Sequence, residues 1–116
     1  MKIGYARVSS SGQHLDVQRT ALTDAGCEKI YAEKESGVKE KPILKELLSF
    51  IRQGDTLVVY KLDRLGRNMK DLLATIEQLQ QRNVSLVSLR DNIDTSSTTG
   101  KLIMHIFASL AEFEET

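Results

Sequence analysis

Two hydrophobic patterns alternate along the chain. Short, nearly continuous apolar runs predict buried strands over residues 3–8, 27–32, 56–60 and 84–89. Apolar residues spaced three and four apart predict helices over residues 13–25, 42–53, 69–82 and 101–116. Strands that alternate with helices form a mostly parallel sheet with right-handed crossovers. We therefore expect an α/β fold with a central sheet of four to five strands and helices on both faces.

Two segments between these elements are polar, and the final helix is unusually apolar. Residues 33–41 are rich in charge, and residues 94–100 are small and polar, so we expect both to be loops. Residues 101–116 are apolar on more than one stripe, which predicts that a partner subunit covers the surplus face. Glutamates crowd the last turn and no glycine stop follows. We expect the helix to continue past Thr116 and the chain to be a fragment; the alternative is a natural terminus whose last turn is frayed.

Composition narrows the possible functions. The 116 residues suit one domain, and 16 basic residues balance 16 acidic ones, so any binding to a polyanion needs a local cluster of cations. A single cysteine forms no internal disulfide and fits a reducing compartment. No apolar run approaches the length of a membrane span, and no glycine-rich nucleotide fingerprint occurs. We expect an intracellular protein without a nucleotide cofactor.

The first predicted strand ends in a possible reactive group. Arg7 and Ser9 are two residues apart, so in an extended chain they lie on the same face. Functional groups of parallel sheets gather beyond the carboxyl ends of the strands, where these two residues fall. A serine here also has an ordinary interpretation, because Ser9, Ser10 or Ser11 could cap the helix that follows.

A basic segment follows the third predicted strand. Residues 61–70 contain four cations and one anion, a local net charge of +3, whereas residues 93–116 have a net charge of −3. If this strand end lies beside the first, then Arg7, Arg64 and Arg67 surround one hydroxyl, with Gly66 allowing a tight turn. Guanidinium groups match phosphate oxygens in shape and charge. A serine among arginines therefore indicates phosphoryl transfer.

Six motifs along the chain point to one family. They are GYARVS at residues 4–9, the spacing of Gln13 and Gln18, SG at 36–37, GDTLVV at 54–59, LDRLGR at 62–67 and DTSSTTGK at 94–101. Together they resemble the catalytic domain of the serine recombinases, in the resolvase and DNA invertase branch. The resemblance covers the whole chain in the family's order and implies a resolvase-like fold.

The resemblance implies a role for each matching residue. Ser9 would attack a DNA phosphodiester and form a 5′-phosphoserine, while Arg7, Arg64 and Arg67 stabilise the transition state and Asp63 orients arginines or assists proton transfer. The implied supporting residues are Gln13, Gln18, Ser36, Lys41 and Glu114. The family uses no metal and no nucleotide energy source.

The resemblance also implies partners and a division of the chain. Expected partners are double-stranded DNA, a second subunit in a homodimer, and a tetramer in the active synaptic complex, in the cytoplasm of a bacterium or encoded by a mobile element. Residues 1–100 would be the catalytic core and residues 101–116 the start of the interface helix. The helix-turn-helix domain that normally follows is absent from these residues, so we expect weak DNA binding.

Two departures from the family pattern keep an alternative open. Lys41 stands where the family usually has arginine, and Glu115 follows Glu114 where the family has arginine. A second hypothesis is therefore an assembly or regulatory module of the same fold that does not cut DNA. A receiver-like phosphate-binding domain is disfavoured, because no acidic cluster ends the first strand.

Overall fold

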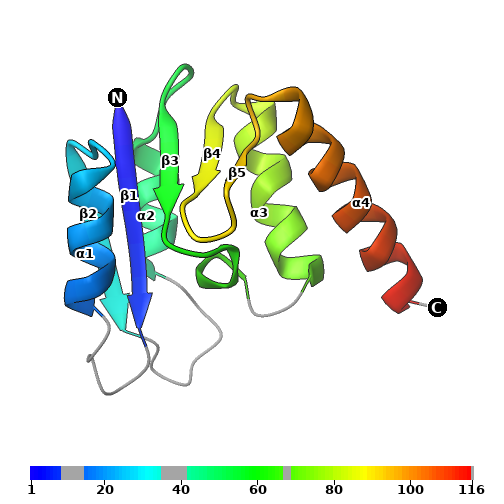
Figure 1. Cartoon of the computed structure of the whole chain (residues 1–116), viewed down its shortest axis with the longest axis horizontal. Helices are drawn as coiled ribbons and strands as arrows, with labels where there is room; N and C mark the ends of the chain where they lie inside the picture. The colour runs from blue at the N-terminus through cyan, green and yellow to red at the C-terminus, as the bar shows by residue number, and fades with distance from the viewer. Residues whose placement is uncertain (9–14, 35–41, 67–68, 116) are drawn as a thin grey trace.

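The computed structural model describes residues 1–8, 15–34, 42–66 and 69–115, with side chains except at positions 63, 108 and 111–115. Its elements are β1 (Lys2–Val8), α1 (Leu15–Asp24), β2 (Lys29–Lys34), α2 (Pro42–Phe50), β3 (Thr56–Val59), the 3-10 turn η1 (Leu62–Arg64), α3 (Met69–Gln81), β4 (Ser85–Ser88), β5 (Ile93–Asp94) and α4 (Thr98–Glu115). The strands form one sheet in the order β2-β1-β3-β4-β5 (Figure 1). β1 to β4 run parallel, and β5 pairs antiparallel to β4.

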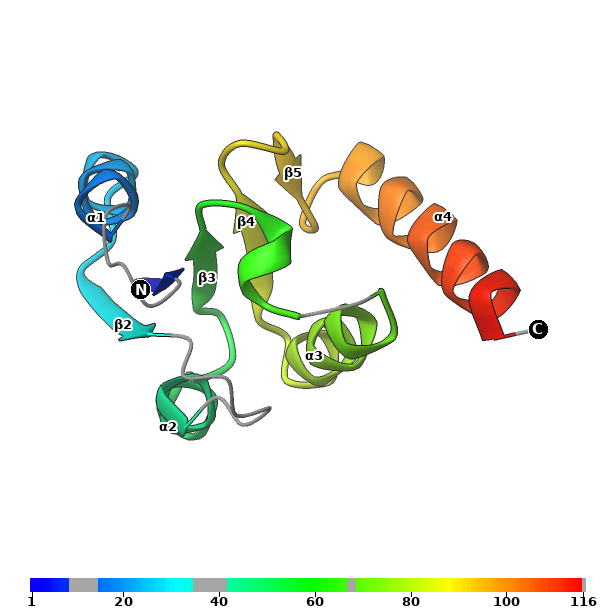
Figure 2. The same cartoon turned by 90° about the horizontal axis from the view of Figure 1, so that it is seen from below.

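Helices cover both faces of the sheet, as the sequence predicts. α1 lies on one face, whereas α2 and α3 lie on the other (Figure 2). The larger core fills the face under α2 and α3 and includes Tyr5 from β1 and Leu47 from α2, both fully buried. A smaller core on the opposite face joins Leu22 of α1 to Ala6 and Val58 of the sheet. The alternation of side chains along β1 therefore supplies both cores.

The two segments predicted as loops are partly regular structure. β2 extends to Lys34, so Glu33 and Lys34 belong to a strand. Asp94 lies in β5, and α4 begins at Thr98, three residues earlier than predicted. The prediction of a loop at Asp94 was wrong because β5 has only two residues, too few for a periodic pattern in the sequence.

The final helix exposes an apolar stripe, in agreement with the predicted surplus face. α4 contacts α3 and β5, and Met104 is buried against the larger core. On its outer side Leu102, Ile106 and Leu110 are 61%, 50% and 47% exposed. Figure 1 shows α4 at the edge of the molecule, beside α3, with its end directed away from the sheet. Among the described residues, no helix combines the length and apolar character needed to cross a bilayer.

Candidate functional site

The carboxyl ends of the parallel strands share one edge of the sheet, where η1 also lies (Figure 1). Arg7, one residue before the end of β1, is only 6% exposed. It shares a strand face with Tyr5, on the side of α2 and α3. Burying a guanidinium is costly unless the fold supplies partners for it, so this position reflects a specific requirement for a cation.

Gln18 of α1 fixes the backbone of Arg7. β3 pairs with β1 only as far as Tyr5, which is opposite Val59. Beyond that point the carboxamide of Gln18 takes over: its Oε1 accepts a bond of 3.2 Å from the Arg7 N–H, and its Nε2 donates a bond of 3.0 Å to the Arg7 carbonyl. Gln18 is 1% exposed, so water does not compete for these bonds. A side chain thus substitutes for the missing strand and holds the end of β1 in extended form.

Tyr5 and Glu33 form a second polar connection near this edge. The Tyr5 hydroxyl donates to Glu33 Oε2. The same carboxylate accepts bonds of 3.3 Å from the backbone N–H groups of Ile43 and Leu44, in the first turn of α2. A negative charge at a helix N-terminus is favourable, because the first N–H groups have no partner within the helix. Glu33 therefore joins β1, β2 and α2.

The turn η1 is anchored from both sides. Leu62 and Leu65 are buried in the larger core, which leaves Arg64 between them half-buried. From the next strand connection, Asp91 Oδ2 accepts bonds from the Leu62 N–H at 2.9 Å and the Ser88 hydroxyl at 2.6 Å. η1 also contacts β1. These contacts place Arg64 at the same edge of the sheet as Arg7.

Gly66 allows the chain to leave η1 close to α3. A Cβ at this position would lie 2.5 Å from the backbone nitrogen of Leu72. Real Cβ atoms do not approach backbone so closely, so only glycine fits without movement of α3. The sequence predicts that Gly66 allows a tight turn, whereas in the structure glycine is required there by the close approach of α3.

A cleft of about 260 Å³ lies between α1 and the ends of β3 and β4. We call it the basic cleft, and it is lined by Val17, Gln18, Tyr60, Lys61, Arg64 and Arg90. Three of these six side chains are cationic and none is acidic. The guanidinium carbon of Arg90 lies 5.8 Å from the centre of the Tyr60 ring. Gln18 connects the cleft to the backbone of Arg7, so a concentration of positive charge borders the end of β1.

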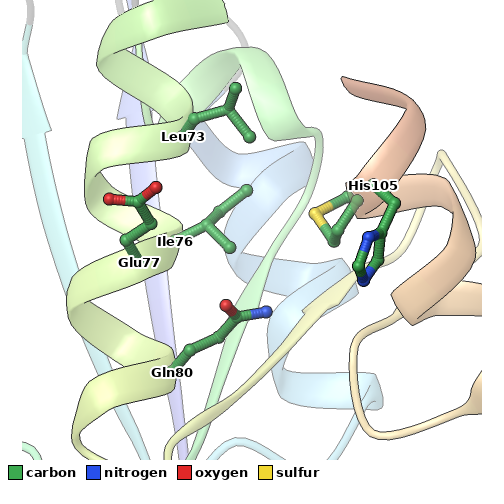
Figure 3. A pocket seen from close by; sticks show the side chains of 6 residues that line it. Leu73, Ile76, Glu77, Gln80 and His105 are labelled. Carbon is green, nitrogen blue, oxygen red and sulfur yellow. The ribbon is translucent and has the colours of Figure 1, made fainter. Parts of the chain in front are cut away.

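A second cavity, of about 150 Å³, lies between α3 and α4 (Figure 3). It is lined by Leu73, Ile76, Glu77 and Gln80 of α3 and by Met104 and His105 of α4. Figure 3 shows the side chains of Ile76 and Gln80 pointing toward His105. Among its described lining residues, Glu77 carries the one carboxylate and none is a lysine or an arginine. Within the described ranges, no three His, Cys, Asp or Glu side chains are grouped to hold a metal ion.

Burial makes the lone thiol a poor nucleophile. Cys27 is half-buried beside the smaller core, and this burial raises the pKa of its thiol, with Lys2 acting weakly in the opposite direction. A raised pKa leaves less thiolate at neutral pH. The cysteine therefore does not compete with a serine for the role of nucleophile.

The structure brings together three of the predicted site residues: Arg7, Gln18 and Arg64. Asp63 belongs to η1 and Glu114 to α4, but their side chains lie outside the described part. The remaining predicted residues lie outside the described residues altogether: Ser9, Gln13, Ser36, Lys41 and Arg67. The convergence of Ser9 and three arginines on one phosphate stays a prediction.

Sequence reasoning missed four residues at this edge. Arg90 and Tyr60 enter the basic cleft from two different strand ends. Glu33 and Asp91 fix neighbouring elements through bonds to residues 28 and 29 positions away. A signal existed for Arg90, because it follows a predicted strand as Lys61 does. No local pattern indicated the roles of the two carboxylates.

Comparisons with known proteins agree with this geometry. The model of the family "Resolvase, N terminal domain" matches residues 2–116. The chain is 53% identical over 117 residues to the transposon Tn552 DNA-invertase BinR of Staphylococcus aureus, covering 98% of this chain and 61% of that protein. It is 50% identical over 115 residues to the serine recombinase gin of Escherichia phage Mu, covering 98% of this chain and 60% of that protein. The chain thus spans about three fifths of the length of these curated relatives.

Solved structures share the fold. The N-terminal catalytic domain of TP901-1 integrase is similar with a TM-score of 0.84 and 30% identity, covering 99% of this chain and 97% of that chain. A resolvase family site-specific recombinase from Streptococcus pneumoniae is similar with a TM-score of 0.80 and 22% identity. The match covers 99% of this chain and 89% of that chain. The second likeness concerns the fold alone.

Proposed function

We propose that this chain, which belongs to the family of resolvase N-terminal domains, is the catalytic domain of a site-specific DNA recombinase of the serine type. In the proposed reaction, a bond forms between Ser9 Oγ and a DNA phosphorus while the bond from phosphorus to the 3′ oxygen breaks. The serine loses a proton and the 3′ oxygen gains one. The products are a 5′-phosphoserine and a free 3′ hydroxyl. After strand exchange, a 3′ hydroxyl attacks the phosphoserine, which restores the DNA ester and the serine.

The observation that carries the proposal is the end of β1. Arg7 is buried there, and Gln18 fixes its backbone through two hydrogen bonds. Arg64 reaches the same edge in the adjoining basic cleft. Ser9 follows Arg7 by two residues in the sequence. A nucleophile attached to so rigid a strand end would meet its phosphate in a defined orientation, which is a large part of catalysis.

Positive charge is what this reaction requires most. Phosphate ester cleavage is among the slowest uncatalysed reactions, so the barrier must fall by on the order of 20 kcal/mol. One well-placed arginine in phosphoryl transfer contributes about 10³- to 10⁵-fold in rate. We propose that Arg7, Arg64 and Arg67 stabilise the transition state and that Asp63 orients them or assists proton transfer to the 3′ oxygen.

The other predicted residues act in support of this group. Gln18 holds Arg7 through the bonds described above. We assign supporting roles of the same kind to Gln13, Ser36, Lys41 and Glu114, on the basis of the family pattern. The proposed division of the chain is a catalytic core at 1–100 and an interface helix from 101, although α4 itself begins at Thr98.

We propose that α4 mediates self-association. Leu102, Ile106 and Leu110 repeat every four residues and are about half exposed or more, which is costly for a free helix face. A second copy of α4 would cover this stripe in a dimer, and two dimers would form the active tetramer on DNA. Changing Ile106 to Asp should shift the dimer toward monomer in light scattering. The change Ser109→Asp, at an exposed position of α4 outside this stripe, should not.

The substrate proposed for the full-length protein is double-stranded DNA in the bacterial cytoplasm. The sources of the relatives, a transposon of Staphylococcus aureus and an Escherichia phage, support this setting. Because those relatives are longer than this chain, we place sequence recognition in residues beyond the region that matches.

The test is covalent attachment to DNA. Full-length protein and its Ser9→Ala variant are incubated with supercoiled DNA that carries the cognate site, and 5′ ends are examined for attached protein. We expect an adduct with the parent only. Equal adduct formation by the alanine variant would exclude Ser9 as the nucleophile. Arg64→Lys keeps the charge but not the planar fork, so we expect it to slow adduct formation about 10²-fold or more.

A second candidate function follows from two departures in the sequence. Lys41 and Glu115 replace arginines of the family pattern, which fits an assembly module that does not cut DNA. Restoring arginine at both positions separates the two proposals. A parent that is inactive and gains cleavage supports the assembly module, whereas a parent that already cleaves excludes it.

A further inference from the structure

Asp91 continues the pairing between β3 and β4 beyond the ends of these strands. Two backbone hydrogen bonds of 3.0 and 2.9 Å join residues 89–90 to residues 59–60. At the next position a side chain takes the place of the backbone, and Asp91 Oδ2 accepts a bond of 2.9 Å from the Leu62 N–H. The first residue of η1 is therefore fixed to the turn that follows β4.

The Leu62 N–H needs a partner from outside η1. The first N–H groups of a helical turn have no acceptor within it. Lys61, which precedes the turn, makes no side-chain cap. Leu62 is only 6% exposed, so water has little access to it. Asp91, 29 positions away in the sequence, supplies the acceptor and so determines where η1 begins.

The carboxylate of Asp91 is itself held in place. The Ser88 hydroxyl donates a bond of 2.6 Å to the same Oδ2, and Ser88 is 1% exposed. Ser88 pairs with Ile93 of β5, so the sheet closes the turn that carries Asp91. Within this turn Asn92 has a φ of 54°, a left-handed conformation that asparagine tolerates better than most residues. Asp91 thus forms a rigid connection from β4 to η1.

We propose that Asp91 is a positioning residue for DNA cleavage, acting through η1 on the guanidinium of Arg64. The inference rests on the proposed recombinase function and adds to it a residue that does not touch the phosphate. Arg64 lies between Leu62, which Asp91 holds, and Leu65, which is fully buried. A shift of about 1 Å in a catalytic group can slow a reaction about 10²-fold. Loss of Asp91 should therefore impair the chemical step and leave DNA binding intact.

The test separates the rate of cleavage from the affinity for DNA. Full-length protein in excess is mixed with DNA that carries the cognate site, and the covalent adduct is followed over time. A separate titration gives the Kd. Asp91→Ala should slow adduct formation by about 10- to 10²-fold, whereas its Kd should stay within about twofold of the parent value. A residue that served only binding would change the Kd instead.

Asp91→Asn separates the hydrogen bonds from the charge. Its amide oxygen can still accept from the Leu62 N–H and the Ser88 hydroxyl. We expect this variant to cleave at a rate within about threefold of the parent. Ser88→Ala removes the hydroxyl that orients the carboxylate. It should slow adduct formation about two- to fivefold and add little in the Asp91→Ala protein.

Asp55→Ala is the matched control for a purely structural effect. Asp55 also accepts a bond of 2.9 Å from a backbone N–H, that of Arg52, but it precedes β3 at the opposite end of the sheet. Its loss should lower the melting temperature, while the rate of adduct formation per folded molecule stays that of the parent. Thermal unfolding of each variant supplies the folded fraction for this correction.

The proposal is overturned by a corrected rate for Asp91→Ala that equals the parent rate, by an Asp91→Asn rate as low as that of Asp91→Ala, or by an equal loss in Asp55→Ala. If Asp91→Ala does not fold, Ser88→Ala decides in its place, and a parental rate there overturns the proposal. Failure of the recombinase proposal is distinguishable, because the parent itself would then form no adduct.

Discussion

Replacing Gln18 tests how much the fold depends on the carboxamide that holds β1. In Gln18→Ala the N–H and the carbonyl of Arg7 lose the bonds of 3.2 and 3.0 Å that this side chain supplies. Each buried backbone group left without a partner costs about 1–3 kcal/mol. Since some water will reach the two groups, we expect the free energy of unfolding to fall by about 2–4 kcal/mol in total. That is a large share of the ~5–15 kcal/mol by which a domain of this size is stable.

The measurement is urea unfolding, with the free energy extrapolated to water. Gln78→Ala provides the control, because Gln78 lies exposed on α3 and the chemical change is identical. Alanine is the better helix former, so the control should be unchanged or slightly more stable. Covalent adduct formation should fall in Gln18→Ala beyond what its unfolded fraction explains, since Arg7 and the residues after it lose their fixed orientation.

Gln18→Glu separates the two hydrogen bonds. A carboxylate can accept from the Arg7 N–H but cannot donate to the Arg7 carbonyl. Burial beside that carbonyl would raise the pKa of the new carboxyl. The loss of stability of Gln18→Glu relative to the parent should therefore shrink as pH falls and grow as pH rises through that pKa. An ordinary surface substitution changes the free energy of unfolding by about 0.5 kcal/mol or less. If Gln18→Ala differs from the parent by no more than that, Gln18 does not hold the end of β1 as described.

Two further predictions concern the ends of the sheet. Gly100→Ala would bring a Cβ to 1.9 Å from the carbonyl oxygen of Asp94, so we expect the start of α4 to shift. The free energy of unfolding in urea should fall by about 2 kcal/mol or more. Thr99→Ala, at the exposed neighbouring position, should be nearly neutral. The pKa of Asp55 is lowered, chiefly because its carboxylate accepts a hydrogen bond of 2.9 Å from the Arg52 N–H. The ionised carboxylate therefore stabilises the fold. This stabilisation is present above the pKa of Asp55 in the unfolded chain and is lost as pH falls through its pKa in the folded protein. The gap in melting temperature between parent and Asp55→Asn should therefore narrow below about pH 4, and a gap independent of pH would contradict this assignment.

Much of the fold follows from local patterns in the sequence. The run from Thr56 to Val59 is β-branched and apolar, and it forms the central strand β3. Pro42 begins α2 as predicted, because its missing N–H would have no partner there. Arg7 and Arg64 were identified as candidates from their positions at strand ends, which the parallel sheet brings to one edge.

The missed features depend on contacts between distant segments. Glu33 and Asp91 occur in stretches whose charge indicates solvent exposure, yet each carboxylate binds backbone N–H groups of another element. Gly66 was expected to allow a tight turn, whereas glycine is required there because a Cβ would lie 2.5 Å from the backbone nitrogen of Leu72 in α3. Such roles arise only when elements pack, so no reading of neighbouring residues could reveal them.

The order of strands also bears on how this protein avoids unwanted assembly. One border of the sheet is β2, whose terminal residues are Lys29 and Lys34, and the other is β5, which is only two residues long. Neither border offers another chain a long neutral template for strand addition, the usual route to fibrils. The self-association proposed for α4 should therefore proceed through contacts between helices, while the two rims of the sheet stay inert.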